Sequence, residues 1–315
     1  MIQINDALRI KVVRSCNLKC SFCHEEGCDK SSIITLQQVD DVLSFAQEFG
    51  YTKFHLTGGE PTLHPNLKAI VQKITDLGYP CGLTSNGQFD GKTLEDLKDA
   101  SLTSINISLH TVDAVEWAKV QEDEDLAKAQ NQIDRALENI LKALELGIRT
   151  KVNIVVSENY ETAIAVIERL AGTGAEIRLL NQLDSNASLI GISSILEHYE
   201  ACEVDEVKIM GSSQTKTMYT SRIGRFVVKT IAQHRDSTIC TGCKENCMEG
   251  FYGIRVIPFI DDIQARLCVQ VTNSRTMQAL DSFRTSPQFR SIRRTGGLVT
   301  AEETQTWKAA IALSS

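Results

Sequence analysis

The order of the predicted elements indicates an α/β fold built on a parallel sheet. Between residues 8 and 180, short stretches rich in β-branched residues alternate with longer stretches of helical periodicity, and glycines follow several of the helical stretches. Strands that alternate with helices form a parallel sheet through right-handed crossovers. Six strand-helix units precede residue 184, which is too few for a complete eight-unit barrel.

The elements of this half follow in regular order. Strands are expected at 8–13, 53–57, 81–84, 104–109, 151–156 and 176–180. Helices are expected at 35–49, 66–77, 92–99, 129–146 and 160–171. Thr35 and Gln38 match a capping box, Gly50 and Gly147 match helix ends, and the charged run 121–125 is expected to be a solvated loop or a helix start. The active site of such a sheet lies at the carboxyl ends of its strands.

The alternation stops after residue 184. A helix is expected at 193–199, and short strands are expected at 215–220, 225–231, 252–259 and 263–269. We therefore divide the chain into a core, 1–184, and a carboxyl-terminal α+β region, 185–315.

Composition excludes several classes of protein. The chain has 315 residues, of which 42% are hydrophobic, and a formal net charge of −7. It can bury a large core, and its acidic balance argues against a surface that coats nucleic acid. The sequence shows no secretory signal and no run of roughly 18 apolar residues that would span a membrane. We therefore expect a cytoplasmic protein with no membrane partner.

Three cysteines, Cys16, Cys20 and Cys23, lie close together in the chain. Thiolates bind both zinc and iron–sulfur clusters, but a structural zinc site closes its shell with four protein ligands. Three thiolates suit a cluster that leaves one iron open to a non-protein ligand. Cys28 as a fourth ligand would restore the zinc interpretation, so this run alone leaves both open.

A second pattern, Thr57-Gly58-Gly59-Glu60-Pro61, follows a predicted strand. The two glycines let a ligand approach the backbone and permit positive φ, and the proline fixes the exit of the turn. Alone, the pattern indicates a strand-to-helix turn. Its specificity comes from its place downstream of the three cysteines.

The two patterns together resemble those of the radical S-adenosylmethionine (SAM) enzymes. The resemblance implies a partial (β/α)6 barrel, a [4Fe–4S] cluster on the three cysteines, and SAM chelated by the open iron. It further implies an electron donor such as flavodoxin or ferredoxin and a 5′-deoxyadenosyl radical that abstracts hydrogen from the substrate. We therefore expect an enzyme that acts on a small, nucleotide- or sugar-like molecule.

The resemblance also implies a SAM site at the strand ends. Its residues are Phe22, Gly58, Gly59, Glu60, Pro61, Ser85, Asn86, Ser108, His110 and Arg178. Taken alone, Ser85 and Asn86 belong to a plain turn. Phe22 is equally suited to simple packing, a lone histidine such as His110 is more often structural than catalytic, and Arg178 suits a substrate anion or the surface as well as SAM.

A second thiol group comprises Cys240, Cys243, Cys247 and Cys268. Four thiols from a loop and a hairpin can close a zinc site or hold a second iron–sulfur cluster, and the spacing favours neither.

Within the radical SAM enzymes, the layout is most similar to the GTP 3′,8-cyclases of molybdenum cofactor biosynthesis, which carry an auxiliary cluster on carboxyl-terminal cysteines. This similarity implies a second iron–sulfur cluster, and it matches Arg9 and Lys151 to cationic positions that contact the nucleotide.

Several departures from the cyclases argue against GTP as the substrate. Residues 244–247 replace the cyclases' Asn-Arg-x-Arg segment, the chain ends without their paired glycines, and His55 replaces a basic residue. Cys247 as a fourth ligand would close the auxiliary cluster and suit it to electron transfer or structure.

Two other functions are compatible with parts of the sequence. A peptide-modifying radical SAM maturase shares the barrel and the cysteine-rich extension, but a leader-binding domain would usually precede the first strand. A zinc or iron–sulfur redox or binding protein without radical chemistry would explain both thiol groups but leave the Gly-Gly-Glu-Pro turn unexplained.

Overall fold

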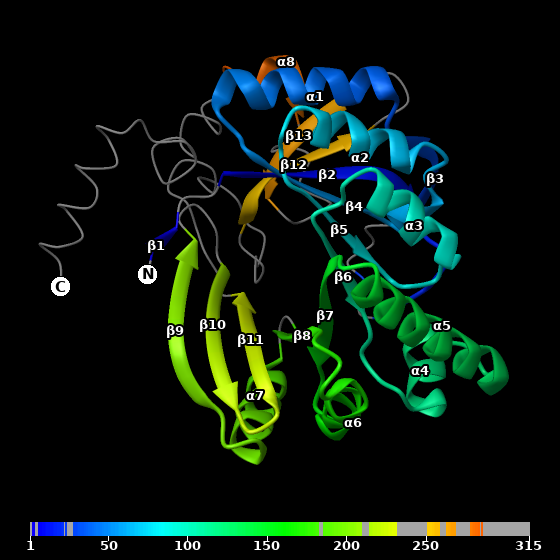
Figure 1. Ribbon diagram of the computed structural model, residues 1–315, viewed down its shortest axis with the longest axis vertical. Coiled ribbons are helices and arrows are strands. Elements are labelled where there is room, and N and C mark those ends of the chain that lie inside the picture. The colour runs from blue at the N-terminus through cyan, green and yellow to red at the C-terminus, as the bar shows by residue number, and fades with distance from the viewer. Residues whose placement is uncertain are drawn as a thin grey trace, which may run out of the picture.

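The computed structural model describes residues 2–3, 6–21, 23, 28–182, 185–209, 214–231, 251–258, 263–268, 278–283 and 285. The strands in these ranges belong to one sheet, and helices cover one face of its central part (Figure 1). No helix in the same ranges is long and apolar enough to cross a membrane.

The centre of the sheet is the parallel unit that the sequence predicts. Its strands, in sheet order, are β2 (Ala7–Ser15), β4 (Lys53–Gly58), β5 (Cys81–Ser85), β6 (Ser104–Ser108), β7 (Arg149–Val156) and β8 (Glu176–Asn181). Each strand pairs in parallel with the next, and each overlaps its predicted range. The α/β class and the partial-barrel layout are therefore confirmed.

The helices follow the strands closely. They are α1 (Leu36–Phe49), the short 3-10 helix η1 (Pro61–Leu63), α2 (Leu67–Asp76), α3 (Gly91–Asp99), α4 (Ala114–Gln121), α5 (Leu126–Glu145), α6 (Glu161–Leu170), α7 (Asn186–His198) and α8 (Leu280–Phe283). The predicted capping box is present, because the Thr35 side chain accepts from the Gln38 N–H and the Gln38 side chain accepts from the Thr35 N–H. Gly50 ends α1 at a φ of 70°.

Helices α4 and α7 differ from the prediction because side-chain caps begin them. The sequence predicts no helix over 114–121, but the Asp113 carboxylate accepts from the Val115 and Glu116 N–H groups and starts α4 there. Ser185 caps α7 in the same way, so this helix begins before the predicted residue 193. A short polar cap followed by weak apolar periodicity is a poor sequence signal, which explains both differences.

The two faces of the sheet have opposite character. On β2, Leu8, Ile10 and Val12 are fully buried against the helices. Alternate residues of a strand point to opposite faces, so Arg9 and Lys11 belong to the other one. We call this second face the inner face, and the strand registers align on it Arg9, His55, Asn106, Lys151 and Arg178.

Strands from beyond residue 184 extend this sheet at both edges. They are β9 (Cys202–Ile209), β10 (Gln214–Ser221), β11 (Gly224–Ile231), β12 (Phe251–Pro258), β13 (Ile263–Cys268) and β14 (Gln278–Ala279). β11 pairs in parallel with β8, and β12 pairs in parallel with β2. The sequence indicates neither β9 nor the short β1 (Ile2–Gln3) and β3 (Cys28–Ile33), which pair with β9 and β2. The division of the chain at residue 184 stays a prediction, and strands on both sides of it share one sheet.

Candidate active site

The three amino-terminal cysteines lie in the loop that leaves β2. Cys16 and Cys20 are half-buried free thiols and Cys23 is exposed, and the Cys23 N–H donates to the Cys20 carbonyl at 2.8 Å. Burial raises the pKa of Cys16 and raises that of Cys20 to about 11, and the neighbouring thiols add to both shifts. The ionisation of one thiol therefore affects the pKa of another.

The cysteine loop offers three thiols, Cys16, Cys20 and Cys23, as metal ligands. The irons of a [4Fe–4S] cluster are held by cysteine thiolates, and three of them leave one iron without a protein ligand. A donor set of three thiols therefore fits a [4Fe–4S] cluster with one open iron.

Glu60 joins two loops next to the cysteines. Its side chain is fully buried, and Oε1 accepts from the Thr62 N–H at 3.1 Å, the Thr62 hydroxyl at 2.7 Å and the Ser85 hydroxyl at 2.7 Å. Oε2 accepts from the Asn86 N–H at 2.7 Å. Burial raises the pKa of Glu60, and these donors act against that shift. The carboxylate thus ties the loop after β5 to the turn after β4.

The paired glycines Gly58 and Gly59 do not use the positive φ that glycine permits, since neither is among the described residues with positive φ. Whether a ligand approaches them stays a prediction. A Cβ on Gly58 would lie 2.5 Å from the Val13 carbonyl oxygen, and one on Gly59 would lie 2.1 Å from that of Ser15. Instead, the Gly59 and Glu60 N–H groups donate to Val13 and Ser15. The glycines therefore let this turn pack directly against the end of β2 and the start of the cysteine loop.

Two amide side chains contact the cysteine sulfurs. Asn86 Nδ2 lies 3.8 Å from Cys16 Sγ and donates to Asn17 Oδ1 at 2.8 Å. Gln121, at the end of α4, donates from Nε2 to Cys20 Sγ at 3.2 Å. The structure thus brings Asn86 to the cysteine loop and links Ser85 to it through Glu60, and it adds Gln121, which the sequence did not indicate. The role of Ser85 and Asn86 as SAM contacts stays a prediction.

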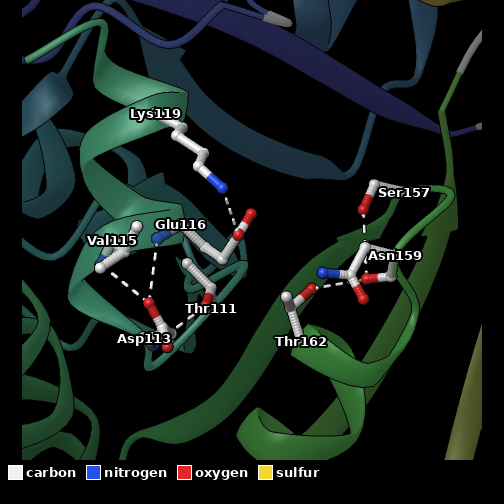
Figure 2. Close-up of polar contacts among 8 residues, drawn as sticks. All are labelled: Thr111, Asp113, Val115, Glu116, Lys119, Ser157, Asn159 and Thr162. Carbon is white, nitrogen blue, oxygen red and sulfur yellow. Dashed lines mark hydrogen bonds and ion pairs between the residues drawn. The ribbon is translucent and has the colours of Figure 1, made fainter.

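The loops after β6 and β7 are fixed by their own side chains. Figure 2 shows the cap that starts α4, where the Thr111 hydroxyl accepts from the Asp113 N–H at 3.0 Å and the Asp113 carboxylate accepts from Val115 and Glu116. In the neighbouring loop, Ser157 and Thr162 both donate to the Asn159 carbonyl. The cap holds the start of α4, and therefore also sets where this helix delivers Gln121.

His110 has a structural partner at the carboxyl end of β6. Its Nδ1 accepts from the Val155 N–H at 3.0 Å, which requires that nitrogen to be unprotonated. Burial lowers the pKa of His110 to about 4. The ring is therefore neutral at pH 7 and joins the ends of β6 and β7, while Ser108 ends β6 as a half-buried residue.

Cations gather on the inner face. Lys151 lies opposite Glu176, and burial followed by the charges of Arg178 and Arg149 lowers the pKa of Lys151 to about 8. Glu176 accepts from Arg178 Nε at 2.7 Å and from Arg149 Nη2 at 3.0 Å. The acid beside Lys151 is therefore already shared by two arginines.

A polar network continues along this face. His55 Nε2 lies 2.6 Å from the Thr84 hydroxyl, and Asn106 Nδ2 donates to the same oxygen at 3.1 Å. Burial, followed by the charge of Arg9, holds the pKa of His55 well below its usual value, so its ring is neutral. The buried Asn106 Oδ1 has no hydrogen-bond partner among the described residues. A buried polar atom without a partner indicates a place for a ligand or water.

Several predicted site residues lie outside the described part of the chain. They are Phe22, Cys240, Cys243 and Cys247. Cys268 ends β13, and only its backbone is described. The auxiliary centre therefore stays a prediction.

Comparison with known proteins gives one consistent result. The radical SAM superfamily model matches residues 10–170. A curated relative from Sulfolobus acidocaldarius, named "Probable GTP 3',8-cyclase", is 28% identical over 244 residues, which are 75% of each chain.

Solved structures show the same fold. Streptococcus suis SuiB bound to S-adenosylmethionine has a TM-score of 0.63 at 16% identity, over 91% of this chain and 67% of SuiB. The enzyme anSMEcpe with bound AdoMet has a TM-score of 0.57 at 14% identity, over 92% of this chain and 80% of its own.

Because the family model covers more than half of the chain, the chain belongs to the radical SAM superfamily and is an enzyme that uses a [4Fe–4S] cluster and SAM.

Proposed function

We propose that this enzyme abstracts hydrogen from an anionic small molecule, nucleotide- or sugar-like, bound on the inner face of the sheet. The observation that carries the proposal is the alignment of three half-buried cations, Arg9, Lys151 and Arg178, on one face of the sheet. A lysine with a depressed pKa in such a group is typical of a functional site. A phosphate bound there would place negative charge among these cations.

The cysteine loop supplies the reactive centre in this proposal. Cys16, Cys20 and Cys23 bind the [4Fe–4S] cluster, and the turn at Gly58–Pro61 with Ser85 and Asn86 borders the SAM site. When bound, the cluster and SAM supply a carbon radical that removes hydrogen from the substrate. The residues of this chain hold the loops in register, chiefly through Glu60, and bind the substrate anion.

The remaining assignments differ in support. Ser108 stays a proposed SAM contact, and Arg178 suits the substrate anion better than SAM because it lies among the inner-face cations. His110 Nδ1 accepts from the Val155 N–H and is therefore not available to a ligand. Flavodoxin or ferredoxin is the proposed electron donor.

The closed second cluster on Cys240, Cys243, Cys247 and Cys268 is also part of the proposal. Iron analysis with Mössbauer spectra tests both centres at once. We expect about eight irons in the wild-type protein and about four after all three of Cys16, Cys20 and Cys23 are changed to alanine, as two four-iron clusters require. About four irons in the wild-type protein and none in the triple variant would show that the first cluster is present and the proposed second one is not.

Substrate class is tested by deoxyadenosine formation from SAM. A panel of nucleotides including GTP, sugar phosphates, their unphosphorylated counterparts and unmodified peptides is compared. We expect stimulation by phosphorylated compounds, and we expect Arg9→Met and Lys151→Met to raise their KM by roughly tenfold or more, since each removes a charged hydrogen-bond donor. Exposed Arg135→Met is the matched control.

Stimulation by peptides alone would overturn the anionic small molecule in favour of a peptide maturase. Solved structures that contain peptides, such as SuiB with its precursor peptide, do not favour that alternative, because identities of 12–17% show the fold alone.

A further inference from the structure

The β10–β11 hairpin adds two lysines to the inner face. It lies along β8 at one edge of the central sheet (Figure 1). Lys216 and Lys229 are direct partners in the antiparallel pair, so their side chains leave the hairpin on the same side. Both residues lie beyond residue 170, where the match to the family model ends.

The face that carries these lysines follows from the register with β8. Val227 pairs with Arg178 and Lys229 pairs with Leu180, so Lys229 shares its face with Arg178. The intervening Phe226 and Val228 are 2% and 4% exposed and belong to the opposite, apolar face. Both lysines are therefore on the inner face.

The surroundings of the pair are rich in like charge. Burial lowers the pKa of both lysines, that of Lys229 strongly, and Arg9 and Arg178 contribute to both shifts. Glu176 lies nearby but is shared by two arginines. Asp205 of β9 pairs with Met218, which is two residues after Lys216 on β10, so Asp205 lies on the same face as Lys216. Like charges directly opposite one another destabilise a sheet, so this arrangement costs the ligand-free protein stability.

We propose that Lys216 and Lys229 form a second anion subsite which, together with Arg9, Lys151 and Arg178, selects substrates that carry several negative charges, such as an oligophosphate chain. The inference rests on the proposed anionic substrate. A single phosphate is satisfied by the first three cations, and the lysine pair becomes useful only when the charge extends toward β10 and β11.

Calorimetric titration of the reconstituted holoenzyme with inorganic phosphate and inorganic tripolyphosphate tests the subsite. We expect wild-type protein to bind tripolyphosphate at least tenfold more tightly than phosphate. The double variant Lys216→Met and Lys229→Met should lose at least tenfold in tripolyphosphate affinity while its phosphate affinity changes less than twofold. Exposed Lys92→Met is the matched control and should bind both as the wild type does.

Thermal melting provides the second measurement. Methionine keeps the length of the lysine stem without its charge, so the ligand-free double variant should melt at a higher temperature than wild type, and tripolyphosphate should raise its melting temperature less. An unchanged tripolyphosphate affinity, or an equal loss for both anions, overturns the subsite while leaving the anionic substrate in place. Failure of wild-type protein to bind either anion overturns both.

A separate observation concerns Gln121 and the cluster loop. This side chain is 8% exposed, and its Oε1 accepts from the Lys19 N–H at 3.0 Å. A backbone N–H can only donate, so Oε1 must face Lys19 and Nε2 must face Cys20. The adjacent Val120 carbonyl accepts from the Ser21 N–H at 2.8 Å. The end of α4 thus forms hydrogen bonds with three consecutive loop residues, Lys19, Cys20 and Ser21, and the Gln121 Nε2–H donates to the Cys20 sulfur.

From this geometry we infer that Gln121 is a positioning residue that also raises the reduction potential of the cluster on Cys16, Cys20 and Cys23. An N–H donor to a ligand sulfur stabilises the more negative, reduced state. This inference rests on the three cysteines as cluster ligands, and it is independent of the substrate.

A redox titration followed by electron paramagnetic resonance, with iron content measured on the same samples, tests the role of Gln121. We expect Gln121→Leu to shift the midpoint potential of this cluster to a more negative value, and Gln121→Glu, which accepts from Lys19 but cannot donate as a carboxylate, to shift it further. Gln130→Leu, at an exposed site on α5, should leave it unchanged.

Unchanged potentials in iron-loaded Gln121→Leu and Gln121→Glu overturn the inference. If Gln121→Leu fails to retain iron, the midpoint potential of Gln121→Glu alone tests the inference. A wild-type protein without iron at this loop would instead overturn the proposed function.

Discussion

Glu60 and the half-buried inner face are two polar regions of the same sheet, and they differ in how their charges are satisfied. The Glu60 carboxylate accepts four hydrogen bonds from Thr62, Ser85 and Asn86. The inner face concentrates cations around Glu176, which two arginines already share.

This difference distinguishes a structural role for Glu60 from a ligand-binding role for the inner face. A buried charge with a complete set of donors stabilises the loops that supply them. A buried group of like charges lowers stability until a ligand of opposite charge arrives, which is the usual cost of a functional site. Substitutions in the first region should therefore lower the stability of the ligand-free protein, whereas removing a cation from the second should raise ligand-free stability and weaken ligand binding.

The largest effect should follow replacement of the carboxylate itself. Glu60→Leu leaves two N–H groups and two hydroxyls without their acceptor, and we expect the free energy of unfolding to fall by roughly 4 kcal/mol. Urea denaturation measures this loss, and exposed Glu138→Leu is the control. A loss below about 1 kcal/mol would show that water replaces the carboxylate and that the network is not structural.

Overpacking the adjacent turn should have a smaller effect. In Gly59→Ala the new methyl group meets Ser15 backbone atoms at 2.1 and 2.4 Å, which cannot move without displacing the cysteine loop. We expect a loss of about 2 to 3 kcal/mol and reduced iron content. Gly91→Ala is the matched control, because its methyl group meets only the flexible Lys142 side chain at 3.2 Å. Equal effects of the two substitutions would contradict the packing argument.

The inner face should respond to pH in the opposite direction to an ion pair. The pKa of Lys151 is about 8 in the folded protein, below its ordinary 10.5, so between these values the unfolded chain binds more protons. Ligand-free stability should therefore rise as pH increases from about 8 toward 10.5, while anion affinity falls over the same range. Denaturant midpoints measured across this range should rise less steeply in Lys151→Met than in wild type. A stability that falls with pH through Lys151 would indicate a paired ammonium instead.

The smallest change in stability is expected at Asn106. Asn106→Leu keeps the approximate volume, loses one hydrogen bond to Thr84 and removes a buried carbonyl oxygen that has no partner among the described residues. We expect unfolding free energy to change by less than about 1 kcal/mol, whereas substrate KM should rise. A large loss of stability with unchanged KM would show that Asn106 has a structural role and does not bind the substrate.

The sequence predicts the central fold and the reactive loop well. Alternating β-rich and helical stretches indicate the six parallel strands, and helix signals such as Thr35 and Gly50 lie where the structure has them. Cys16, Cys20 and Cys23 with the Gly-Gly-Glu-Pro turn indicate the radical SAM family. These features are local in sequence, because spacing within one loop or one helix determines them.

Contacts between distant segments were decided only by the tertiary structure. Glu60 meets Ser85 and Asn86 because two neighbouring parallel strands end at the same edge, and Gln121 meets Cys20 because α4 reaches back over the cysteine loop. Lys216 and Lys229 join the inner face because β11 pairs with β8. The sequence of a strand shows which of its residues share a face. It does not show which strand lies next to it or which face becomes the inner one. The packing of the whole sheet determines both, and therefore also the charge of the site.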